Sequence, residues 1–544
     1  MIADISITEK SFGSKVLMSG VKFSMDQREK VGVIGRNGVG KSTLFTILTG
    51  KDTDFTGEVI YRRGTVVAST EQEHHAIGDT TVLQYVLAGL PEYSELSDVI
   101  ETYPFHMGDD MKKIEVYTQA LERFDQKGFY RIEEAIEREL EAFQLPGVAH
   151  APFASLSGGQ KRLVEVVKIM HAKADLALLD EPTNHMDYVA KKQFIDWMKG
   201  TPEAMLVITH DRDVLRHVDR IIELKDGGSV SYKGNYDAYL KQNAASTGSA
   251  MNEFELIEKR ITNLKQKVID YQRLKEKARN PATIQKFKRL EQTSRTELAE
   301  LQAKEKPTFW IDKESVDTLH YKTANQYEKF KAKNIRMNIK GEQSRSKHVL
   351  VKAEALSLGY DSPLFDGVNI DLREGEAVEL RGRNGTGKST LIKRLLGDES
   401  ITLFGGELQH DPQVRIGVYE QEVSPTYFTL PLHDAIEHLY LDRSLPINET
   451  KIRQLMSEYL FTEGDGQVPV KRLSGGQKAR LQLIAMLAND PQLLILDEPT
   501  NHLDLPSIED LETALGRFGG AILYVSRDDY FRQAVPATVA MIGA

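Results

Sequence analysis

Two stretches of the chain have the residue types and the spacing that bind phosphate. Each is a loop that follows a short apolar, strand-like segment and ends in Gly-Lys-Ser-Thr. Glycines let backbone N–H groups close around phosphate oxygens, the lysine reaches the terminal phosphates, and the serine hydroxyl can ligate Mg²⁺. The first loop consists of Gly35, Arg36, Asn37, Gly38, Val39, Gly40, Lys41, Ser42 and Thr43, and the second of Gly382, Arg383, Asn384, Gly385, Thr386, Gly387, Lys388, Ser389 and Thr390. Two matches in the same context make a chance origin negligible.

Two pairs of adjacent carboxylates stand at the ends of apolar segments. Residues 176–179 run into Asp180 and Glu181, and residues 493–496 run into Asp497 and Glu498. A carboxylate at the end of a buried strand is well placed to ligate a metal ion, and its neighbour can orient an attacking water. We therefore predict Glu181 and Glu498 as catalytic groups.

A third motif, Leu-Ser-Gly-Gly-Gln, opens a basic helical segment in each half and is called the signature below. Serine hydroxyls and glycine amides at a helix start form another anion cradle. The signature residues are Ser157, Gly158, Gly159 and Gln160 in the first half, and Ser474, Gly475, Gly476 and Gln477 in the second. Gln72 and Gln421 each follow a strand-like segment and are selected only by their place in the order of motifs.

This set of motifs resembles the ATP-binding cassette ATPases, over both halves of the chain. The resemblance implies an α/β fold of two P-loop cassettes paired head to tail, with ATP between the P-loop of one and the signature of the other. Site one would combine Lys41, Gln72, Asp180, Glu181 and His210 with Ser474, Gly475 and Gly476, and site two would combine Lys388, Gln421, Asp497 and Glu498 with Ser157, Gly158 and Gly159. Mg²⁺ would be held by Ser42, Gln72 and Asp180 in one site and by Ser389, Gln421 and Asp497 in the other. Phe12 and Tyr360 match the aromatic residue that stacks on adenine, although either could equally be a core residue.

The two predicted sites differ at one catalytic position. The signature serines, the first carboxylates and a third landmark all lie 317 residues apart, and that landmark is His210 in one half and Arg527 in the other. The family pattern has histidine at both places, where it contacts the γ-phosphate. Arginine is longer and always charged, so it could hold a phosphate but not act as a neutral hydrogen-bonding group. We expect site two to bind ATP well and hydrolyse it slowly; the alternative is that Arg527 substitutes adequately.

The elements that must carry these motifs require more than one domain, because 544 residues are too many for one. We predict cassettes at residues 1–240 and 346–544, joined by a helical linker at 241–345. No apolar run approaches the roughly 18 residues needed to cross a membrane, and the N-terminus lacks the features of a signal peptide. The absence of cysteine excludes disulfides and thiol catalysis and fits the cytoplasm.

The linker differs from both cassettes in pattern and charge. A small polar run at residues 243–250 predicts a hinge, and apolar residues then recur every three or four positions as far as Ala278. Asn280-Pro281 predicts a turn, and therefore a helical hairpin with arms of roughly 25 to 30 residues. Residues 241–345 contain 23 Lys plus Arg against 14 Asp plus Glu, so the linker carries +9 and the remainder −19. This division favours contact with a polyanion; the alternative is a solvated basic coiled coil.

Some of the linker residues could contact nucleic acid directly. Basic residues cluster around the turn at Lys275, Lys277, Arg279, Lys286, Lys288 and Arg289, and binding through them would be strongly salt-dependent. Phe309, Trp310 and Tyr321 follow the second arm. They could stack on bases, or they could pack the base of the hairpin against a cassette.

The first cassette also contains an insertion. Gln72 and Ser157 are 85 residues apart, whereas Gln421 and Ser474 are 53 apart, so the first cassette has 32 extra residues. We place them in the acidic segment 90–130. The segment resembles the insertion that the ABC-F ATPases of translation have at this place, which implies an arm that contacts a basic ribosomal protein; the alternative is an enlarged helical subdomain without a partner.

The repeated Asp-Glu-Pro-Thr-Asn-His motif and the charged linker of about a hundred residues narrow the resemblance to the ABC-F group, the ribosome-binding ATPases of translation. The resemblance implies a monomeric cytoplasmic ATPase that uses ATP and Mg²⁺, enters the ribosomal E site and contacts rRNA and tRNA near the peptidyl-transferase centre through the hairpin 241–345. It would tune or rescue translation, or displace antibiotics; the short tip at 279–283 favours the general role. The rival readings are the ATP-hydrolysing subunit of a membrane transporter and a DNA-associated cassette ATPase.

Overall fold

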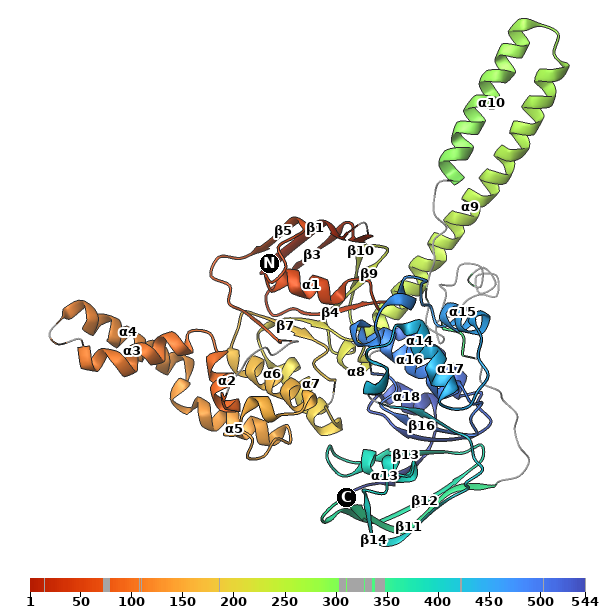
Figure 1. Cartoon of the computed structure of the whole chain (residues 1–544). Coiled ribbons are helices and arrows are strands. Elements are labelled where there is room, and N and C mark those ends of the chain that lie inside the picture. Colours follow the sequence, from red (N-terminus) through yellow and green to blue (C-terminus); the bar gives the residue numbers. More distant parts are fainter. Residues whose placement is uncertain are drawn as a thin grey trace. The chain divides into compact units, whose positions relative to one another are not determined.

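The computed structural model describes residues 1–13, 15–71, 79–106, 108, 110–184, 186–302, 310, 327, 335–337, 348–420, 423–501 and 503–543. The predicted site residues Gln72 and Gln421 and the aromatic residues Phe309 and Tyr321 lie outside them. The chain divides into two compact units, one formed by residues 1–236 with 335–544 and the other by 237–334 (Figure 1). The first unit contains both predicted cassettes, and the second contains the linker.

The first cassette is built on two sheets. A six-stranded sheet has the order β10 (Gly228–Lys233), β9 (Arg220–Lys225), β4 (Lys30–Gly35), β8 (Ala204–Ile208), β7 (Leu176–Asp180) and β6 (Val67–Ser69). Its strands are parallel except for the β9–β10 pair. The other sheet is antiparallel and contains β1 (Ala3–Phe12), β2 (Lys15–Met18), β3 (Val21–Met25) and β5 (Thr56–Tyr61).

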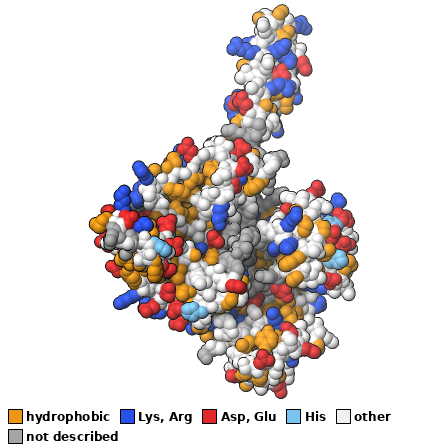
Figure 2. All heavy atoms as spheres, turned by 60° about the vertical axis from the view of Figure 1, so that its left-hand side comes forward, with side chains coloured by type: hydrophobic (Ala, Val, Ile, Leu, Met, Phe, Trp, Pro, Cys, Tyr) orange, Lys and Arg blue, Asp and Glu red, His pale blue; other side chains and the backbone are white. Residues whose placement is uncertain are grey.

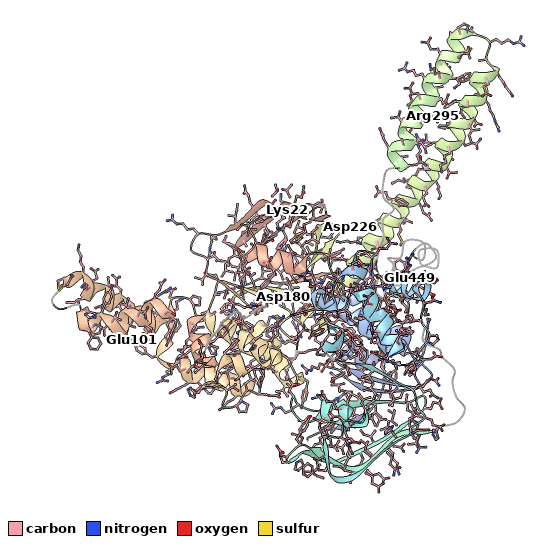
Figure 3. The ribbon with its side chains drawn as sticks, in the orientation of Figure 1. Lys22, Glu101, Asp180, Asp226, Arg295 and Glu449 are labelled. Carbon is pink, nitrogen blue, oxygen red and sulfur yellow. The ribbon has the colours of Figure 1, made fainter. Side chains whose placement is uncertain are left out.

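Strand β7 shows why the parallel sheet lies in the middle of the cassette. Every residue of the strand is buried, as expected for a parallel strand that is covered on both faces. Because side chains alternate between faces, Leu176 and Leu178 pack against the antiparallel sheet, whereas Ala177 and Leu179 pack against the helices. This sandwich fixes the carboxyl end of the strand, where Asp180 stands (Figure 3).

The helices of the first cassette include α1 (Lys41–Leu48), α2 (Val82–Ala88), α5 (Ile132–Ala142), α6 (Gly158–Ala172), α7 (Tyr188–Gly200) and α8 (Arg212–Leu215). The predicted insertion forms helices α3 (Tyr93–His106) and α4 (Met111–Lys127), which extend from the cassette as a pair (Figure 1). At their base Glu92 forms ion pairs with Arg123 at 2.7 Å and Lys127 at 3.0 Å. Glu101 lies on α3 (Figure 3).

The second cassette repeats this plan. A parallel sheet has the order β15 (Ile416–Tyr419), β16 (Leu493–Asp497), β17 (Ala521–Val525), β13 (Ala377–Arg381) and β18 (Thr538–Met541). The antiparallel sheet consists of β12 (Pro363–Arg373), β11 (Val349–Gly359) and β14 (Thr402–His410). Its helices include α13 (Lys388–Leu395), α14 (Leu432–Leu441), α15 (Glu449–Glu458), α16 (Gly475–Leu487), α17 (Leu505–Leu515) and α18 (Asp529–Ala534).

The linker forms two long helices, α9 (Tyr236–Lys277) and α10 (Pro281–Gln302), of 42 and 22 residues. Asn280 caps the turn, because its side-chain oxygen accepts a hydrogen bond from the backbone of Ala282 at 2.9 Å. The rings of Tyr271 and Phe287 stack between the arms with centroids 6.4 Å apart. The predicted hairpin is therefore present, but its arms are less equal in length than expected.

The predicted hinge at residues 243–250 is wrong, because this run continues helix α9. The hydroxyls of Ser246 and Ser249 donate to carbonyls of Asn243 and Ala245 in the preceding turn, which lets polar residues remain helical. The Asn243 amide donates at 2.9 Å to the carbonyl of Trp310, a buried residue of the same unit. These contacts outweigh the weak helix propensity of the run.

None of the helices that the structure describes is long and apolar enough to cross a membrane.

Candidate active site

The two P-loops have the backbone that their sequence requires. Gly40 and Gly387 stand immediately before α1 and α13 with φ angles of 106° and 96°, in the left-handed region that favours glycine. A side chain at Gly40 would also overlap Met18, and one at Gly387 would overlap Phe365. Both helices therefore begin directly at a lysine, with their N-terminal N–H groups directed towards the loop.

Each P-loop lysine folds back over its own loop. The Lys41 ammonium group donates to the carbonyls of Gly35 at 2.7 Å and Arg36 at 3.2 Å. Lys388 makes the same contacts with Gly382 at 2.9 Å and Arg383 at 2.6 Å. Burial lowers the pKa of Lys41, against the opposing effect of Glu181, and it lowers the pKa of Lys388. The negative charge of a bound polyphosphate would favour the charged form of both lysines and so raise their pKa values again.

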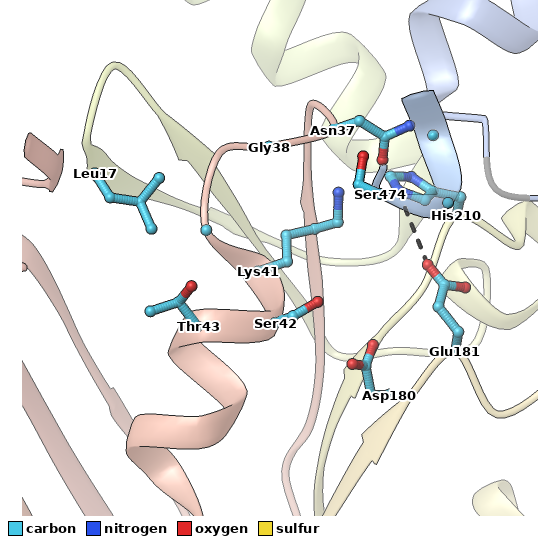
Figure 4. Close-up of a pocket in the computed structure, with 13 residues that line it drawn as sticks. Leu17, Asn37, Gly38, Lys41, Ser42, Thr43, Asp180, Glu181, His210 and Ser474 are labelled. Carbon is cyan, nitrogen blue, oxygen red and sulfur yellow. Dashed lines mark ion pairs between the residues drawn. The ribbon is translucent and has the colours of Figure 1, made fainter. Parts of the chain in front are cut away.

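A cavity of about 300 Å³ lies over the first P-loop, and its walls come from both cassettes (Figure 4). The first cassette contributes Leu17, Asn37, Gly38, Gly40, Lys41, Ser42, Thr43, Asp180, Glu181 and His210, and the second contributes Ser474, Gly475 and Gly476. Lys41 and Ser42 face Asp180 and Glu181 across the cavity, with Ser474 near His210 (Figure 4). The structure thus brings together the site-one residues predicted from the sequence, within the part of the chain that it describes.

Two aspartates, which end the repeated carboxylate motif and for which the sequence predicted no role, connect the cassettes at the P-loops. The backbone N–H of Asn37 donates at 3.0 Å to Asp504, and that of Asn384 donates at 3.3 Å to Asp187. Asp504 and Asp187 also cap helices α17 and α7 of their own cassettes. Their positions differ by the same 317 residues as the other landmarks, and this offset is the signal that could have identified them.

The carboxylate pairs lie at the ends of β7 and β16, as predicted. Asp180 and Asp497 are buried. Glu181 and Glu498 follow them with φ angles of 46° and 51°, an unfavourable conformation for residues with a side chain. The same strained backbone at both positions turns each glutamate out of the strand, and such strain is typical of functional sites.

Glu181 lies where a general base could act. Its carboxylate accepts a 3.3 Å hydrogen bond from the Thr209 hydroxyl, and His210 Nε2 lies 3.9 Å from Glu181 Oε1 (Figure 4). Burial and the neighbouring Asp180 raise the pKa of Glu181 to about 8. A carboxyl group with a raised pKa is a stronger base when it is ionised.

The second site has the same parts with different partners. The Ser389 hydroxyl donates to Asp497 at 2.9 Å, which brings the two predicted Mg²⁺ ligands together. Oxygen ligands of this kind suit Mg²⁺, so the residues present fit the ion. Glu498 is 1% exposed, and the Arg527 guanidinium forms an ion pair with it at 2.5 Å. Burial raises the pKa of Glu498, and Arg527 opposes that rise.

The signature residues cap their helices through reciprocal contacts. The backbone N–H of Gln477 donates to the Ser474 hydroxyl at 3.3 Å, and the N–H of Ser474 donates back to the Gln477 side chain at 3.0 Å. Ser157 and Gln160 have the same arrangement at the same distances. Gly158 and Gly475 are the first residues of α6 and α16, with Gly159 and Gly476 next. Each glutamine, in the first turn of its helix, therefore fixes the orientation of the serine that caps that helix.

The other predicted loop residues surround these groups. Val39 packs against the core of the first cassette, Thr390 is buried, and the Thr386 hydroxyl donates to the Arg383 carbonyl at 3.0 Å. Arg383 Nε lies 4.0 Å from the Asp187 carboxylate. Gly385 has a φ angle of 79° at an open position in the second loop.

The predicted adenine-stacking residues are exposed. Phe12 is 56% exposed and Tyr360 is 47% exposed, so neither is a core residue. The Lys10 ammonium group lies over the Phe12 ring, 4.9 Å from its centroid. The described lining of the cavity contains Leu17 instead of Phe12, and this apolar side chain was not predicted from the sequence.

Comparisons with known proteins agree with this arrangement. The family model described as ABC transporter matches residues 18–184 and 365–501, a large part of each cassette. The ATP-binding protein YdiF of Bacillus subtilis is 30% identical over 99% of this chain and 79% of its own length. The energy-dependent translational throttle protein EttA of Mycobacterium tuberculosis is 29% identical over 96% of this chain and 88% of its own length.

Among solved structures, the archaeal ribosome recycling factor aABCE1, in complex with the ribosomal stalk protein aP1, matches with a TM-score of 0.55. The match covers 98% of this chain and 89% of that one at 15% sequence identity. This likeness establishes a shared fold of tandem cassettes.

Proposed function

Because this chain belongs to the ABC-F group of the ATP-binding cassette family, and is therefore an ATP-binding ATPase, we propose that it acts on the ribosome. In this proposal it binds the ribosome with ATP in both sites and the cassettes closed. Hydrolysis opens the cassettes and releases it. The hairpin is the part that acts on the ribosome, and the cassettes control when it does so.

The observation that carries the proposal is the cavity shared by the two cassettes. Because Lys41 comes from one cassette and Ser474 from the other, a nucleotide bound there would contact both and favour their closed pairing. Mg²⁺ would be held by Ser42 and Asp180, with Gln72 as a further ligand, and it would neutralise phosphate charge. Glu181 would accept a proton from the attacking water, and His210 would contact the terminal phosphate.

The second site would use the corresponding residues. Lys388 would hold the phosphates, while Ser389, Asp497 and Gln421 would hold Mg²⁺. Ser157, Gly158 and Gly159 would complete the site from the first cassette. Phe12 and Tyr360 are exposed and could stack on the adenine rings.

Charge on the hairpin supports a ribosomal partner. Lys and Arg side chains are distributed along it (Figure 2), and residues 241–345 carry +9. Within the described part of the hairpin, Lys275 pairs with Glu291, whereas Lys277, Arg279, Lys286, Lys288 and Arg289 near the turn have no ion-pair partner. These cations can meet RNA phosphates without breaking contacts within the hairpin.

The relatives point to the same process. EttA is named for a role in translation, and aABCE1 for ribosome recycling and a complex with a stalk protein. We place the hairpin in the E site, with its tip near the peptidyl-transferase centre and in contact with rRNA and tRNA. The helices α3 and α4 lie in segment 90–130, which has nine acidic and four basic residues, and they would contact a basic ribosomal protein.

Replacing Lys277 and Lys286 with glutamine tests the hairpin directly, and the same change at Lys259 and Lys265, which are also exposed, is the matched control. The affinity for ribosomes, measured by pelleting, should fall more for the Lys277 and Lys286 variant than for the control. The affinity of that variant should also depend less steeply on salt concentration. Equal losses from both pairs would contradict contact through the tip.

The biological role has two forms, general control of translation and protection against ribosome-targeting drugs. Growth with and without the gene in the presence of macrolide, lincosamide, pleuromutilin and oxazolidinone drugs separates them. Sensitivity to one drug class on loss of the gene indicates protection, whereas a growth change without drug indicates a general factor.

A further inference from the structure

Arg527 contacts three groups around site two. Its guanidinium forms the ion pair with Glu498, donates at 2.9 Å to the Asn384 side chain in the P-loop, and donates to the Met186 carbonyl of the opposite cassette. The arginine side chain is 19% exposed and the glutamate 1%. A single cation therefore ties together the base, the P-loop and the partner cassette.

Site one holds its glutamate differently. Glu181 is 22% exposed and lines the cavity, and His210 Nε2 lies 3.9 Å from its carboxylate. The Thr209 and Ser526 hydroxyls each accept a hydrogen bond from the backbone two residues further on, and the Thr209 hydroxyl also donates to Glu181 at 3.3 Å. Glu181 thus faces the space where a water would attack, while Glu498 faces a guanidinium.

A general base needs an oxygen lone pair directed at the water. Arginine is charged at every accessible pH, and the Arg527 Nε atom lies 2.5 Å from one oxygen of Glu498, Oε1, so it holds this carboxylate by charge. A histidine side chain, unlike arginine, has no permanent charge and can leave the carboxylate available. The ion pair therefore competes with the step that Glu498 would perform.

We propose that Arg527 masks Glu498 as a general base, so that site two retains ATP while site one carries out turnover. This inference rests on the proposed composite sites and adds the regulation of one of them. Arg527 and Lys388 place two cations beside the second P-loop, and Arg527 contributes to lowering the Lys388 pKa, after burial. The positive charge of these two side chains would attract the phosphates of ATP, so site two should bind ATP firmly although it cleaves ATP slowly.

The test isolates site two by replacing Glu181 with glutamine and measuring single-turnover ATP cleavage by the full chain without ribosomes. Adding Arg527→His should raise cleavage on the order of tenfold or more, because general-base catalysis contributes roughly 10²- to 10⁴-fold. Adding Glu498→Gln to that variant should remove the gain.

Cleavage that does not rise in the Glu181→Gln, Arg527→His variant would overturn the proposal, and so would a gain that persists without Glu498. The reciprocal change keeps the test decisive if Arg527→His fails to fold. Placing His210→Arg in a Glu498→Gln background should slow cleavage at site one by a similar factor while ATP remains bound; unchanged cleavage would contradict masking. Because ribosomes are absent, failure of ribosome binding would leave these results unaffected.

Discussion

The backbone N–H of Asn37 in the first cassette donates a 3.0 Å hydrogen bond to the carboxylate of Asp504 in the second. The other oxygen of Asp504 accepts a hydrogen bond from Ser507 and caps helix α17. Burial opposes ionisation of Asp504, but the hydrogen bonds from Ser507 and Asn37 lower its pKa. One buried carboxylate therefore connects a helix of one cassette to the phosphate-binding loop of the other.

Replacing Asp504 with asparagine separates these two tasks. The Asn oxygen can still cap Ser507, but only one acceptor remains, so the link to Asn37 should be lost. We expect ATP turnover at site one, measured in a Glu498→Gln background, to fall while the thermal midpoint changes little. Asp504→Ala should lose about 1 kcal/mol of stability as well. Full turnover in Asp504→Asn would show that the link is dispensable.

Gly476 should not tolerate a methyl group. A Cβ at this position would overlap the Asn37 side chain across the cassette interface, whereas a Cβ at Gly158 in the other signature meets open space. Gly476→Ala should therefore lower the thermal midpoint of the nucleotide-free protein, and Gly158→Ala should leave it unchanged. Equal midpoints for the two variants would contradict the close approach of the cassettes at site one.

The Arg212 guanidinium, two residues after His210, connects this loop of the first cassette to the second cassette. It is buried and lies 2.7 Å from Glu512 and 3.8 Å from Asp528. Removing it leaves two carboxylates in a poorly solvated place, so Arg212→Ala should destabilise the protein by about 3–5 kcal/mol. The exposed pair of Arg453 and Glu449 provides the control, and Arg453→Ala should cost at most about 0.5 kcal/mol. Similar thermal midpoints for both variants would rule out a buried cross-cassette anchor.

The raised pKa of Glu181 gives stability a pH dependence. Its pKa is about 8 in the folded protein and 4.5 in its ordinary state, so the folded state binds the proton more tightly. The resulting stabilisation is complete below pH 4.5 and is lost as the pH rises through 8. Glu181→Gln should therefore melt close to the parent at pH 4.5 and increasingly above it as the pH rises to 9, without nucleotide. A difference that does not grow with pH would contradict the burial of this carboxyl group.

The sequence was sufficient to predict those parts of the site whose residues are neighbours in the chain. Glycines before Lys41 and Lys388, and carboxylates after apolar strands, specify backbone conformation and position within a few residues. The Asp504 and Asp187 links were not predicted, because they exist only when two cassettes are paired. Arg527 was identified by the 317-residue offset, but its contact with Glu498 depends on side-chain geometry that spacing does not encode.

In the linker, the sequence predicted the turn correctly but not the hinge. Its turn at Asn280 was predicted because proline restricts the preceding residue. The run 243–250 was misread as a hinge because its composition is typical of loops, whereas contacts from Asn243 to the carbonyl of Trp310 keep it helical. Tertiary contacts of this kind override local propensity.

We propose that ATP in the paired cassettes holds this protein on the ribosome. Ribosome co-sedimentation of the Glu181→Gln, Glu498→Gln double variant, with ATP and with ADP, measures this directly. The double variant should accumulate in the ribosomal fraction with ATP and be released with ADP. Its absence from ribosomal fractions in ATP would show that ATP does not hold the protein there.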